Sequence, residues 1–375
     1  MSERIPAQVA PSRLTSPDMY DALHPAFLNT PNFDAHTPST GNEYRVIPTA
    51  NLFFKHLLEQ IGEATDTIDL QFYTLEADTQ VLPIINAAMD AAQTGVRVRM
   101  LVDHLASDPR RLLSSALVRR KANQLPTMTV KTIEQPKHAR GSLANRDHKK
   151  IVAIDGGQAH GRAYIGGINL ADRSLRWNDF MIALRGPIAR CVQQDFDDSW
   201  EARNTTAKLI TDIGEPGTHL LTDTKTDQQI LPFALQSIRQ ATDRIWLETP
   251  YLDVAGIGQA LIAAKRERPS LDVRVIVPRF NIYPVHRLKG TRMLDPLARA
   301  GIETHRYGVT YRRLNHPKLL LADRVAMFGS SNFNASSMAG GNAEIIVATT
   351  NPNIVQQLDT WYQEDLRESR QHPQA

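Results

Sequence analysis

The stretch LNHPKLLLADRVAMFGSSN, residues 314–332, decides the fold. It places His316 and Lys318 two positions apart, followed by Asp323 and by a glycine-initiated turn at 329–332. Alternate residues of an extended strand point to the same side, so the histidine and the lysine share a face. The apolar run after the lysine predicts a buried strand that carries a base and a cation at one end.

A near copy of this pattern lies upstream in the chain. Its members are His148, Lys150, Asp155, Gly166, Gly167 and Asn169, which correspond to His316, Lys318, Asp323, Gly329, Ser330 and Asn332. A lone His-x-Lys pair is most often a solvated strand end. Two copies with the same Gly-x-x-Asn turn downstream instead predict a duplicated site.

The duplication extends well beyond the two motifs. Ala-Thr-Asp occurs at 64–66 and again at 241–243, each time before an apolar strand that reaches a tyrosine. A repeat of roughly 170 residues is too long for a solenoid and indicates a duplicated domain. Strands that alternate with helices predict an α/β fold, with two similar halves built of mixed sheets and flanking helices.

The chain divides into four predicted segments. Residues 1–43 are rich in Pro, Thr, Ser and Asn and are expected to form an extended or disordered arm. Residues 44–203 form the first half and residues 219–375 the second, and a linker at 204–218 joins them.

Composition sets bounds on the class of protein. The 375 residues are 42% hydrophobic and 22% charged, as in an ordinary globular protein, and the net charge of +3 is too small to argue for nucleic acid. The single cysteine, Cys191, excludes an intramolecular disulfide, fits a reducing compartment and is expected to pack as a small apolar group.

Hydropathy predicts no membrane span and no secretory signal. No apolar run approaches the ~18 residues of a transmembrane helix, and the N-terminus lacks an apolar core. We expect a cytoplasmic protein that meets any lipid from solution, with a peripheral place at the inner face of the membrane as one option.

The paired motifs suit the chemistry of a phosphodiester. Displacing an alkoxide from phosphorus requires a nucleophile and a proton for the leaving oxygen, and two histidines can divide these roles. Lys150 and Lys318, with Asn169 and Asn332 as neutral donors, would hold the non-bridging oxygens. The chain has no cysteine pair, no HExxH and no Asp-rich loop, so we predict no metal and no cofactor.

The motifs resemble the paired His-Lys-Asp motif of the phospholipase D superfamily, and their wording is closest to bacterial cardiolipin synthases and their soluble relatives. The resemblance covers about residues 44–368 and is carried by NRDHKK at 145–150, GGIN at 166–169, WND at 177–179 and GP at 186–187. It implies halves packed about a pseudo-twofold axis with one active site between them. It also implies a covalent phosphohistidine on His148, with His316 as the acid and then the base.

The resemblance assigns roles to further residues. Asp179 and Glu344 lie ten to twelve positions beyond the two asparagines, and in the family such carboxylates orient histidines across the pseudo-dyad. The resemblance therefore implies that Asp179 orients His316 and that Glu344 orients His148. Asp155 and Asp323 are expected to fix the loop of each motif, and the glycines to be structural.

The two copies differ in two places. Gly167 stands where the second copy has Ser330, so one hydroxyl is missing. Ten residues separate Asp155 from Gly166, against five in the second copy, and the extra turn carries His160, which is expected to be a loop residue.

The implied activity is transfer of a phosphatidyl group, from a phospholipid such as phosphatidylglycerol, to an alcohol or water. The first alternative is a metal-independent phosphodiesterase or nuclease of the same superfamily, with water as acceptor, acting on phospholipid or nucleic acid. The second is a non-catalytic phosphate-binding module. A lipid enzyme should show an apolar rim, and a nuclease a basic groove. The candidate rim is Phe280, Ile282, Tyr283 and Val285 beside Arg287 and Lys289. The candidate basic residues are Lys137, His138, Arg140, Arg146, Arg306, Arg312 and Arg313. The oligomeric state stays open.

Overall fold

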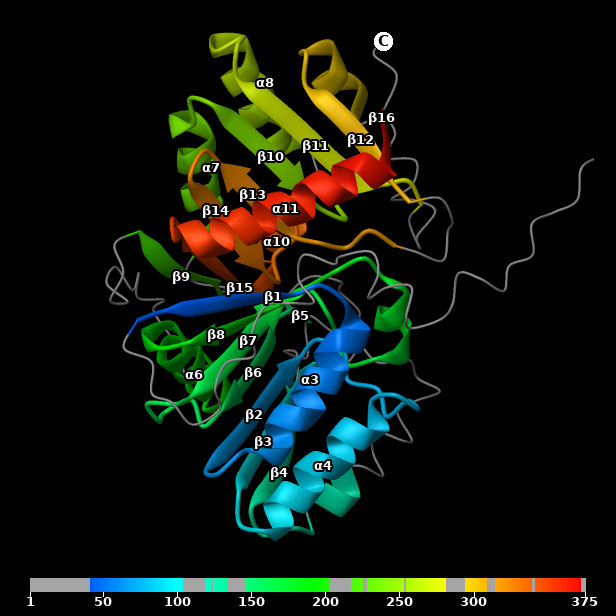
Figure 1. The fold of residues 1–375 in the computed structure, drawn as a ribbon, viewed down its shortest axis with the longest axis vertical. Coiled ribbons are helices and arrows are strands. Elements are labelled where there is room, and N and C mark those ends of the chain that lie inside the picture. The colour runs from blue at the N-terminus through cyan, green and yellow to red at the C-terminus, as the bar shows by residue number, and fades with distance from the viewer. Residues whose placement is uncertain are drawn as a thin grey trace, which may run out of the picture.

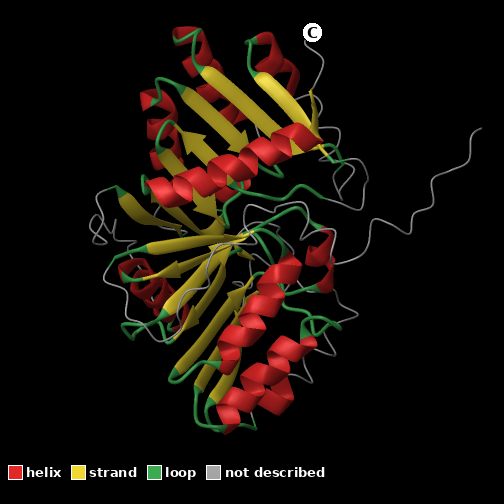
Figure 2. Ribbon diagram, in the orientation of Figure 1, coloured by secondary structure: helices red, strands yellow, loops and turns green. Residues whose placement is uncertain are grey.

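The fold is taken from a computed structural model. It describes residues 41–103, 119–122, 124–133, 146–202, 217–224, 228–252, 254–280, 294–308, 314–338 and 341–371. Two mixed sheets lie one above the other, each with helices on its faces (Figures 1 and 2).

The first sheet has seven strands. In spatial order they are β1 (Glu43–Ile47), β8 (Met181–Arg185), β7 (Arg162–Gly166), β6 (Lys150–Ile154), β2 (Thr67–Phe72), β3 (Arg97–Asp103) and β4 (Met128–Ile133). The three strands β2, β3 and β4 run parallel, and the other neighbours are antiparallel. The apolar strand after the first motif, β6, is therefore central and completely buried.

The second sheet repeats this order. Its strands are β9 (Thr218–Asp223), β15 (Asn342–Thr349), β14 (Val325–Gly329), β13 (Leu319–Ala322), β10 (Arg244–Glu248), β11 (Asp272–Pro278) and β12 (Glu303–Tyr307), extended at the edge by β16 (Ser369–Gln371). The parallel and antiparallel pairings match those of the first sheet. The prediction of two similar α/β halves is confirmed.

Helices divide the apolar interior into three cores. The helices α3 (Ala50–Gly62) and α4 (Leu82–Gln93) cover the outer face of the first sheet, and α7 (Ile230–Gln240) and α8 (Gln259–Glu267) that of the second. The helices α6 (Pro187–Trp200) and α11 (Pro352–Glu368) pack between the sheets in a core that both halves share. Figure 1 shows α11 at the boundary, beside β1 of the first half. Shorter helical turns are η3 (Asp172–Arg176), η4 (Val254–Gly258) and α10 (Ala335–Met338).

Local sequence explains the helix ends. The hydroxyl of Thr49 accepts the backbone N–H of Leu52 at 3.2 Å and caps α3, as its position before the helix predicts. Gly95 follows α4 at φ +102°, a conformation that glycine adopts without steric cost. The helix α4 begins at Leu82, after a turn at residues 79–81 that leads into it.

The repeated Ala-Thr-Asp segments have a structural explanation. The carboxylate of Asp155 accepts the backbone N–H groups of residues 65–67 and the hydroxyl of Thr65, at 2.8–2.9 Å. Asp323 accepts the equivalent donors of residues 242–244 at 2.8–3.2 Å. Both aspartates have φ near +50°, a region that aspartate tolerates better than most residues. Each motif aspartate thus ties its hairpin to the start of β2 or β10.

The segment boundaries stay a prediction, since residues 1–40 and 203–216 lie outside the described part of the chain. The strands β1 and β9 begin at Glu43 and Thr218, within one residue of the predicted starts of the two halves. Within the described ranges, no helix is long and apolar enough to cross a bilayer. Cys191 is partly buried and packs against the central core.

Candidate active site

The two motifs meet where the halves contact each other. The two-residue strand β5 (Arg146–Asp147) comes from the first half of the chain but pairs in parallel with the start of β15 in the second sheet. The next residue, His148, donates its backbone N–H to Ala343 O at 2.9 Å. In reverse, His316 donates its backbone N–H to Asn178 O at 2.8 Å. Each half therefore anchors the histidine of the other.

Each imidazole also contacts a carboxylate from the opposite half. Nδ1 of His148 lies 3.0 Å from Oε2 of Glu344, and Nδ1 of His316 lies 2.6 Å from Oδ2 of Asp179. A carboxylate only accepts hydrogen bonds, so we assign the proton of each ring to Nδ1. This assignment leaves each Nε2 without a proton, and Nζ of Lys318 lies 3.2 Å from Nε2 of His316.

The two lysines are buried beside the histidines. Lys150 is 0% exposed and Lys318 is 1% exposed, and each Nζ donates to the carbonyl oxygen of its own histidine. Nζ of Lys318 also lies 2.7 Å from Nδ1 of His316 and 3.8 Å from the Asp179 carboxylate. The motif residues of both halves therefore form one site.

The electrostatics bear this out. Burial lowers the pKa of Lys150 to about 7 and that of Lys318 to about 8, although carboxylates from both halves act in the opposite direction. Burial also lowers the pKa of both imidazoles, and for each ring the lysine of the other half adds to the effect. Charges in the two motifs thus act on one another across the boundary.

The pKa values of the two carboxyl groups are shifted in opposite directions. Burial raises the pKa of Asp179 to about 7, against the effect of Lys318. Burial acts upward on the pKa of Glu344 too, but His148 and Lys150 outweigh it and hold that pKa below its ordinary value. Glu344 is therefore the firmly ionised partner of the pair.

The residues behind the two carboxylates also differ. The hydroxyl of Ser330 donates to Oε2 of Glu344 at 2.5 Å and accepts the backbone N–H of Ile345 at 3.0 Å. In the first half the Asp179 carboxylate itself fills this space, and any Cβ at Gly167 would collide with it. The first half thus lacks the hydroxyl of Ser330, and its carboxyl group belongs to an aspartate, which is one methylene shorter than Glu344.

The amides and the other motif glycines complete the site. Oδ1 of Asn169 accepts the backbone N–H of Thr74 at 3.0 Å, so its NH2 group remains the donor. Asn332 is 7% exposed, and its Oδ1 has no hydrogen-bond partner among the described residues. Gly166 and Gly329 lie where a Cβ would strike the backbone of the neighbouring strand, which explains the glycine at both positions.

Two aromatic contacts were not predicted. The Tyr73 ring meets the His148 imidazole edge-on at 4.8 Å between centroids, and the Trp177 ring lies 4.7 Å from that of His316. Both aromatic side chains are partly exposed. In the sequence, Tyr73 ends the apolar strand that follows the first Ala-Thr-Asp segment, and Trp177 lies in the WND segment that carries the family resemblance. Neither feature predicts a contact with a histidine.

Other candidate residues lie elsewhere. Arg146 is 7% exposed, and its guanidinium lies 3.6 Å from the Asp103 carboxylate, so it is no solvated groove residue. His160 lies 3.5 Å from Asp155, in the extra turn. Arg306 is on β12. The remaining basic candidates, Lys137, His138, Arg140, Arg312 and Arg313, and the rim candidates after Phe280, fall outside the described residues.

The described residues contain no group of three or more His, Cys, Asp or Glu side chains arranged to hold a metal ion. Metal independence stays a prediction.

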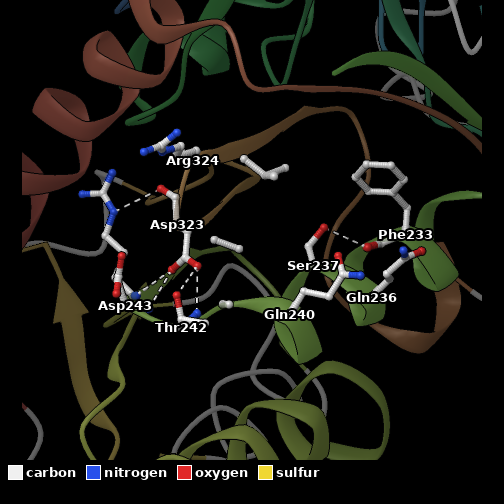
Figure 3. Close-up of a pocket in the computed structure, with 12 residues that line it drawn as sticks. Phe233, Gln236, Ser237, Gln240, Thr242, Asp243, Asp323 and Arg324 are labelled. Atoms are coloured by element: carbon white, nitrogen blue, oxygen red, sulfur yellow. Dashed lines mark hydrogen bonds between the residues drawn. The ribbon is translucent and has the colours of Figure 1, made fainter. Parts of the chain in front are cut away.

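A pocket of about 640 Å³ lies around Asp323 in the second half (Figure 3), lined by Phe233, Gln240, Thr242, Arg324 and others. It is at the opposite end of β13 from Lys318 and does not include the histidines.

Comparison with known proteins places the chain in a family. The chain belongs to the family described as cardiolipin synthase, PLD-like domain, whose sequence model matches residues 57–200 and 234–366. The two matched segments correspond to the two halves and contain both motifs. The resemblance to the phospholipase D superfamily is therefore confirmed.

Individual relatives agree with this family. The chain is 26% identical over 349 residues to cardiolipin synthase A of Pseudomonas entomophila, a match that covers 88% of this chain and 70% of that protein. Cardiolipin synthase A of Pseudomonas putida is also 26% identical, with 88% and 69% covered.

Solved structures share the fold. Phosphatidylserine synthase of Haemophilus influenzae matches with a TM-score of 0.69 and 12% identity, over 94% of this chain and 92% of that one. Polyphosphate kinase of Porphyromonas gingivalis matches with a TM-score of 0.61 and 15% identity, over 89% of this chain and 48% of that one. Identities this low support the two-half fold alone.

Proposed function

We propose that this protein is a phosphatidyltransferase of the phospholipase D type, similar to cardiolipin synthases. The observation that carries the proposal is the reciprocal pairing of His148 with Glu344 and of His316 with Asp179, beside two buried lysines. Family membership and the relatives named cardiolipin synthase A support phospholipid as the substrate class.

In the first step, Nε2 of His148 attacks the phosphorus atom of a phosphodiester. The P–O bond to the leaving alcohol breaks, and that oxygen takes a proton from Nε2 of His316. The negative charge of the bound phosphodiester opposes the effect of burial and of the lysines on the pKa of His316 and favours the protonated ring that this step requires. The ionised Glu344 favours His148 as nucleophile, because it accepts the Nδ1 proton and stabilises the positive charge that develops on the ring.

The lysines and asparagines act on the non-bridging oxygens. Lys150 and Lys318 supply positive charge, and the NH2 groups of Asn169 and Asn332 donate hydrogen bonds. Because all four groups are buried, their interaction with the phosphoryl oxygens is weakly screened by water. The charge that spreads over these oxygens in the transition state is thereby stabilised.

In the second step the acceptor replaces the nucleophile. Neutral His316 takes the proton of an alcohol or water as its oxygen attacks phosphorus, and the P–N bond to His148 breaks. With the headgroup of a second phosphatidylglycerol as acceptor, the product is cardiolipin and the released alcohol is glycerol. With water, the product is phosphatidic acid.

A phospholipid donor requires the protein to reach a bilayer surface, so we also propose a peripheral association with membranes. Sedimentation with anionic vesicles, with phosphatidylcholine vesicles as the control, tests it. Failure to sediment with either kind would remove this part of the proposal.

The experiment that tests the activity offers two substrates to the purified protein. Phosphatidylglycerol vesicles and single-stranded DNA are incubated separately, with and without excess EDTA, and the products are identified by mass spectrometry. We expect cardiolipin or phosphatidic acid from the vesicles and equal rates with the chelator. DNA cleavage without lipid turnover would make the protein a nuclease, and loss of turnover in EDTA would contradict metal independence.

A further inference from the structure

Four buried side chains behind His316 form a closed loop of hydrogen bonds, which we call the carboxyl–amide network. Asn178 Nδ2 donates to Asn315 Oδ1 at 2.9 Å and to Asp365 Oδ2 at 2.5 Å. Asn315 Nδ2 donates to Glu248 Oε1 at 2.8 Å. The carboxyl groups of Glu248 and Asp365 close the loop by a hydrogen bond to each other. All four side chains are at most 4% exposed.

The network joins the two halves at the residue next to Asp179. Asn178 comes from the first half, whereas Asn315, Glu248 and Asp365 belong to the second. The backbone of Asn178 donates to Leu314 O at 2.9 Å and accepts from His316 N at 2.8 Å. Since Asp179 directly follows Asn178, the network fixes the Asp179 carboxyl group and the His316 imidazole relative to each other.

Counting donors shows that the network requires one proton. Both Glu248 oxygens already accept, one from Asn315 and the other from Trp361 Nε1 at 3.2 Å. Oδ2 of Asp365 accepts from Asn178. Two ionised carboxylates cannot hydrogen-bond to each other, so the pair holds one proton. Because both Glu248 oxygens already accept, we assign this proton to Asp365, which donates it to Glu248. Burial, which raises the pKa of Glu248 to about 7, fits a pair that holds a proton at neutral pH.

At the equivalent place in the first half, a lysine provides positive charge beside the buried carboxylates. Gln71 stands where Glu248 stands, because each pairs with the first residue after the motif lysine. Its Nε2 donates to Asp147 at 2.8 Å, and the neighbouring Lys149 forms an ion pair with Asp195 at 2.7 Å. The second half has Pro317 in place of that lysine. In the second half, a proton shared by Glu248 and Asp365 reduces the negative charge, as the Lys149 ammonium does in the first half.

We propose that Glu248 and Asp365 are positioning residues, which share one proton and thereby hold Asp179 and His316 in the arrangement that delivers a proton to the leaving alcohol. This inference rests on the proposed function in taking His316 as the acid. Neither carboxyl group touches the substrate.

Two amide substitutions of nearly equal size separate this role from simple space filling. Asp365→Asn keeps the pattern, because its Nδ2 can donate to Glu248 while its Oδ1 accepts from Asn178. Glu248→Gln breaks it, because one acceptor oxygen becomes an NH2 group that faces another donor, either Asn315 or Trp361. We expect Asp365→Asn to lose less than about threefold in kcat, and Glu248→Gln to lose at least about tenfold with little change in KM.

The choice of leaving group distinguishes positioning from general destabilisation. Each variant is assayed on phosphatidylglycerol and on a p-nitrophenyl phosphodiester of the same lipid. The second leaving group hardly needs an acid, so Glu248→Gln should impair the first substrate at least about tenfold more than the second. A destabilised protein would lose both activities equally. Asp359→Asn, at a half-buried ion-pair partner of Arg244 on the same helix as Asp365, is the matched control.

A second measurement does not depend on turnover. In protein labelled with 15N-histidine, the hydrogen-bonded Nδ1 proton of His316 should give a downfield NMR resonance, assigned by its loss in His316→Asn. We expect this resonance to persist in Asp365→Asn and to shift or broaden in Glu248→Gln. An unchanged resonance and an unchanged ratio of the two substrates in Glu248→Gln would overturn the proposal. Inactivity of the wild type on both esters would count against the proposed function alone, since the resonance still tests the network.

Discussion

His148 and His316 occupy equivalent places in the two halves, yet different groups surround them. The partner of His148, Glu344, rests on the Ser330 hydroxyl and stays ionised, whereas the partner of His316, Asp179, lies over Gly167 and has a pKa of about 7. Backbone geometry is shared, since each histidine N–H reaches the opposite half at 2.8 or 2.9 Å. Duplication therefore accounts for the placement of the two bases, and we attribute their proposed division into nucleophile and acid to the residues behind them.

The largest test of this comparison removes each base. We expect His148→Ala and His316→Ala each to lower turnover of phosphatidylglycerol by at least about 10³-fold, since both steps lose a reacting group. With a 32P-labelled p-nitrophenyl ester, His316→Ala should still accumulate an acid-labile label on the protein, and His148→Ala should not. The opposite labelling pattern would reverse the two roles. His160→Ala, in the extra turn, is the control and should retain wild-type turnover.

The next test exchanges the residues behind the carboxylates. Gly167→Ser should drive a side chain into the Asp179 carboxylate and displace it from His316, with a loss of about 10²-fold in kcat. Ser330→Gly removes one charge-assisted hydrogen bond to Glu344 and should cost about tenfold. The double variant Gly167→Ser with Asp179→Glu recreates the second-half pair and should recover part of the loss. Full activity in Gly167→Ser would show that the two carboxylate sites are interchangeable.

The pH dependence should reveal the two lysines. A lysine is cationic below its pKa, so raising the pH through about 7 for Lys150 and about 8 for Lys318 removes the charges that hold an anionic phosphate. We expect kcat/KM to fall at least about tenfold per pH unit above pH 8, because each lost proton is required for binding. Bound phosphate opposes deprotonation, so kcat at saturation should fall less. A flat kcat/KM profile up to pH 9.5, at constant ionic strength, would contradict the assignment.

The smallest effect concerns the motif aspartates. Asp155→Asn should lower the free energy of unfolding by about 2 kcal/mol, because an amide offers one acceptor oxygen to four donors, and Asp323→Asn should cost less because its carboxylate is less buried. Activity of the folded protein should barely change, since both residues lie away from the histidines. Urea denaturation measures the difference.

The same pair predicts a pH dependence of stability. Burial acts upward on the pKa of Asp155 and of Asp323, but the backbone N–H donors outweigh it and hold both below the ordinary value. A lowered pKa stabilises the fold above the unfolded-state value near 4, and this contribution is lost as pH falls through the folded-state value. The gap between wild type and Asp155→Asn should therefore narrow below about pH 4. A gap that stays constant down to pH 2 would contradict the ionised form as the acceptor.

The sequence predicted the parts of this molecule that depend on local pattern. The apolar runs after Lys150 and Lys318 are the central strands β6 and β13, and the repeated Ala-Thr-Asp segments precede β2 and β10. The contacts of Asp179 and Glu344 came with the family resemblance, because no local signal says which histidine a carboxylate reaches.

The sequence analysis did not predict the carboxyl–amide network or the strand β5, and the reason is physical. The hydrogen-bonded partners in the network lie 67 to 187 positions apart, so only the packed halves bring them together. Glu248 and Asp365 look like ordinary polar positions within a strand and a helix. A strand of two residues such as β5 has no periodicity to detect.

The pairing of β5, from the first half, with β15 of the second half has a consequence for protein synthesis. The first half leaves the ribosome with a complete His148 motif, but the carboxylate that contacts this imidazole, Glu344, lies on β15, 196 positions further along the chain. Until β15 is translated and docks, the nascent protein holds a base without its partner. Under the proposed mechanism, a chain that ends before β15 lacks this carboxylate and should not turn over phospholipid.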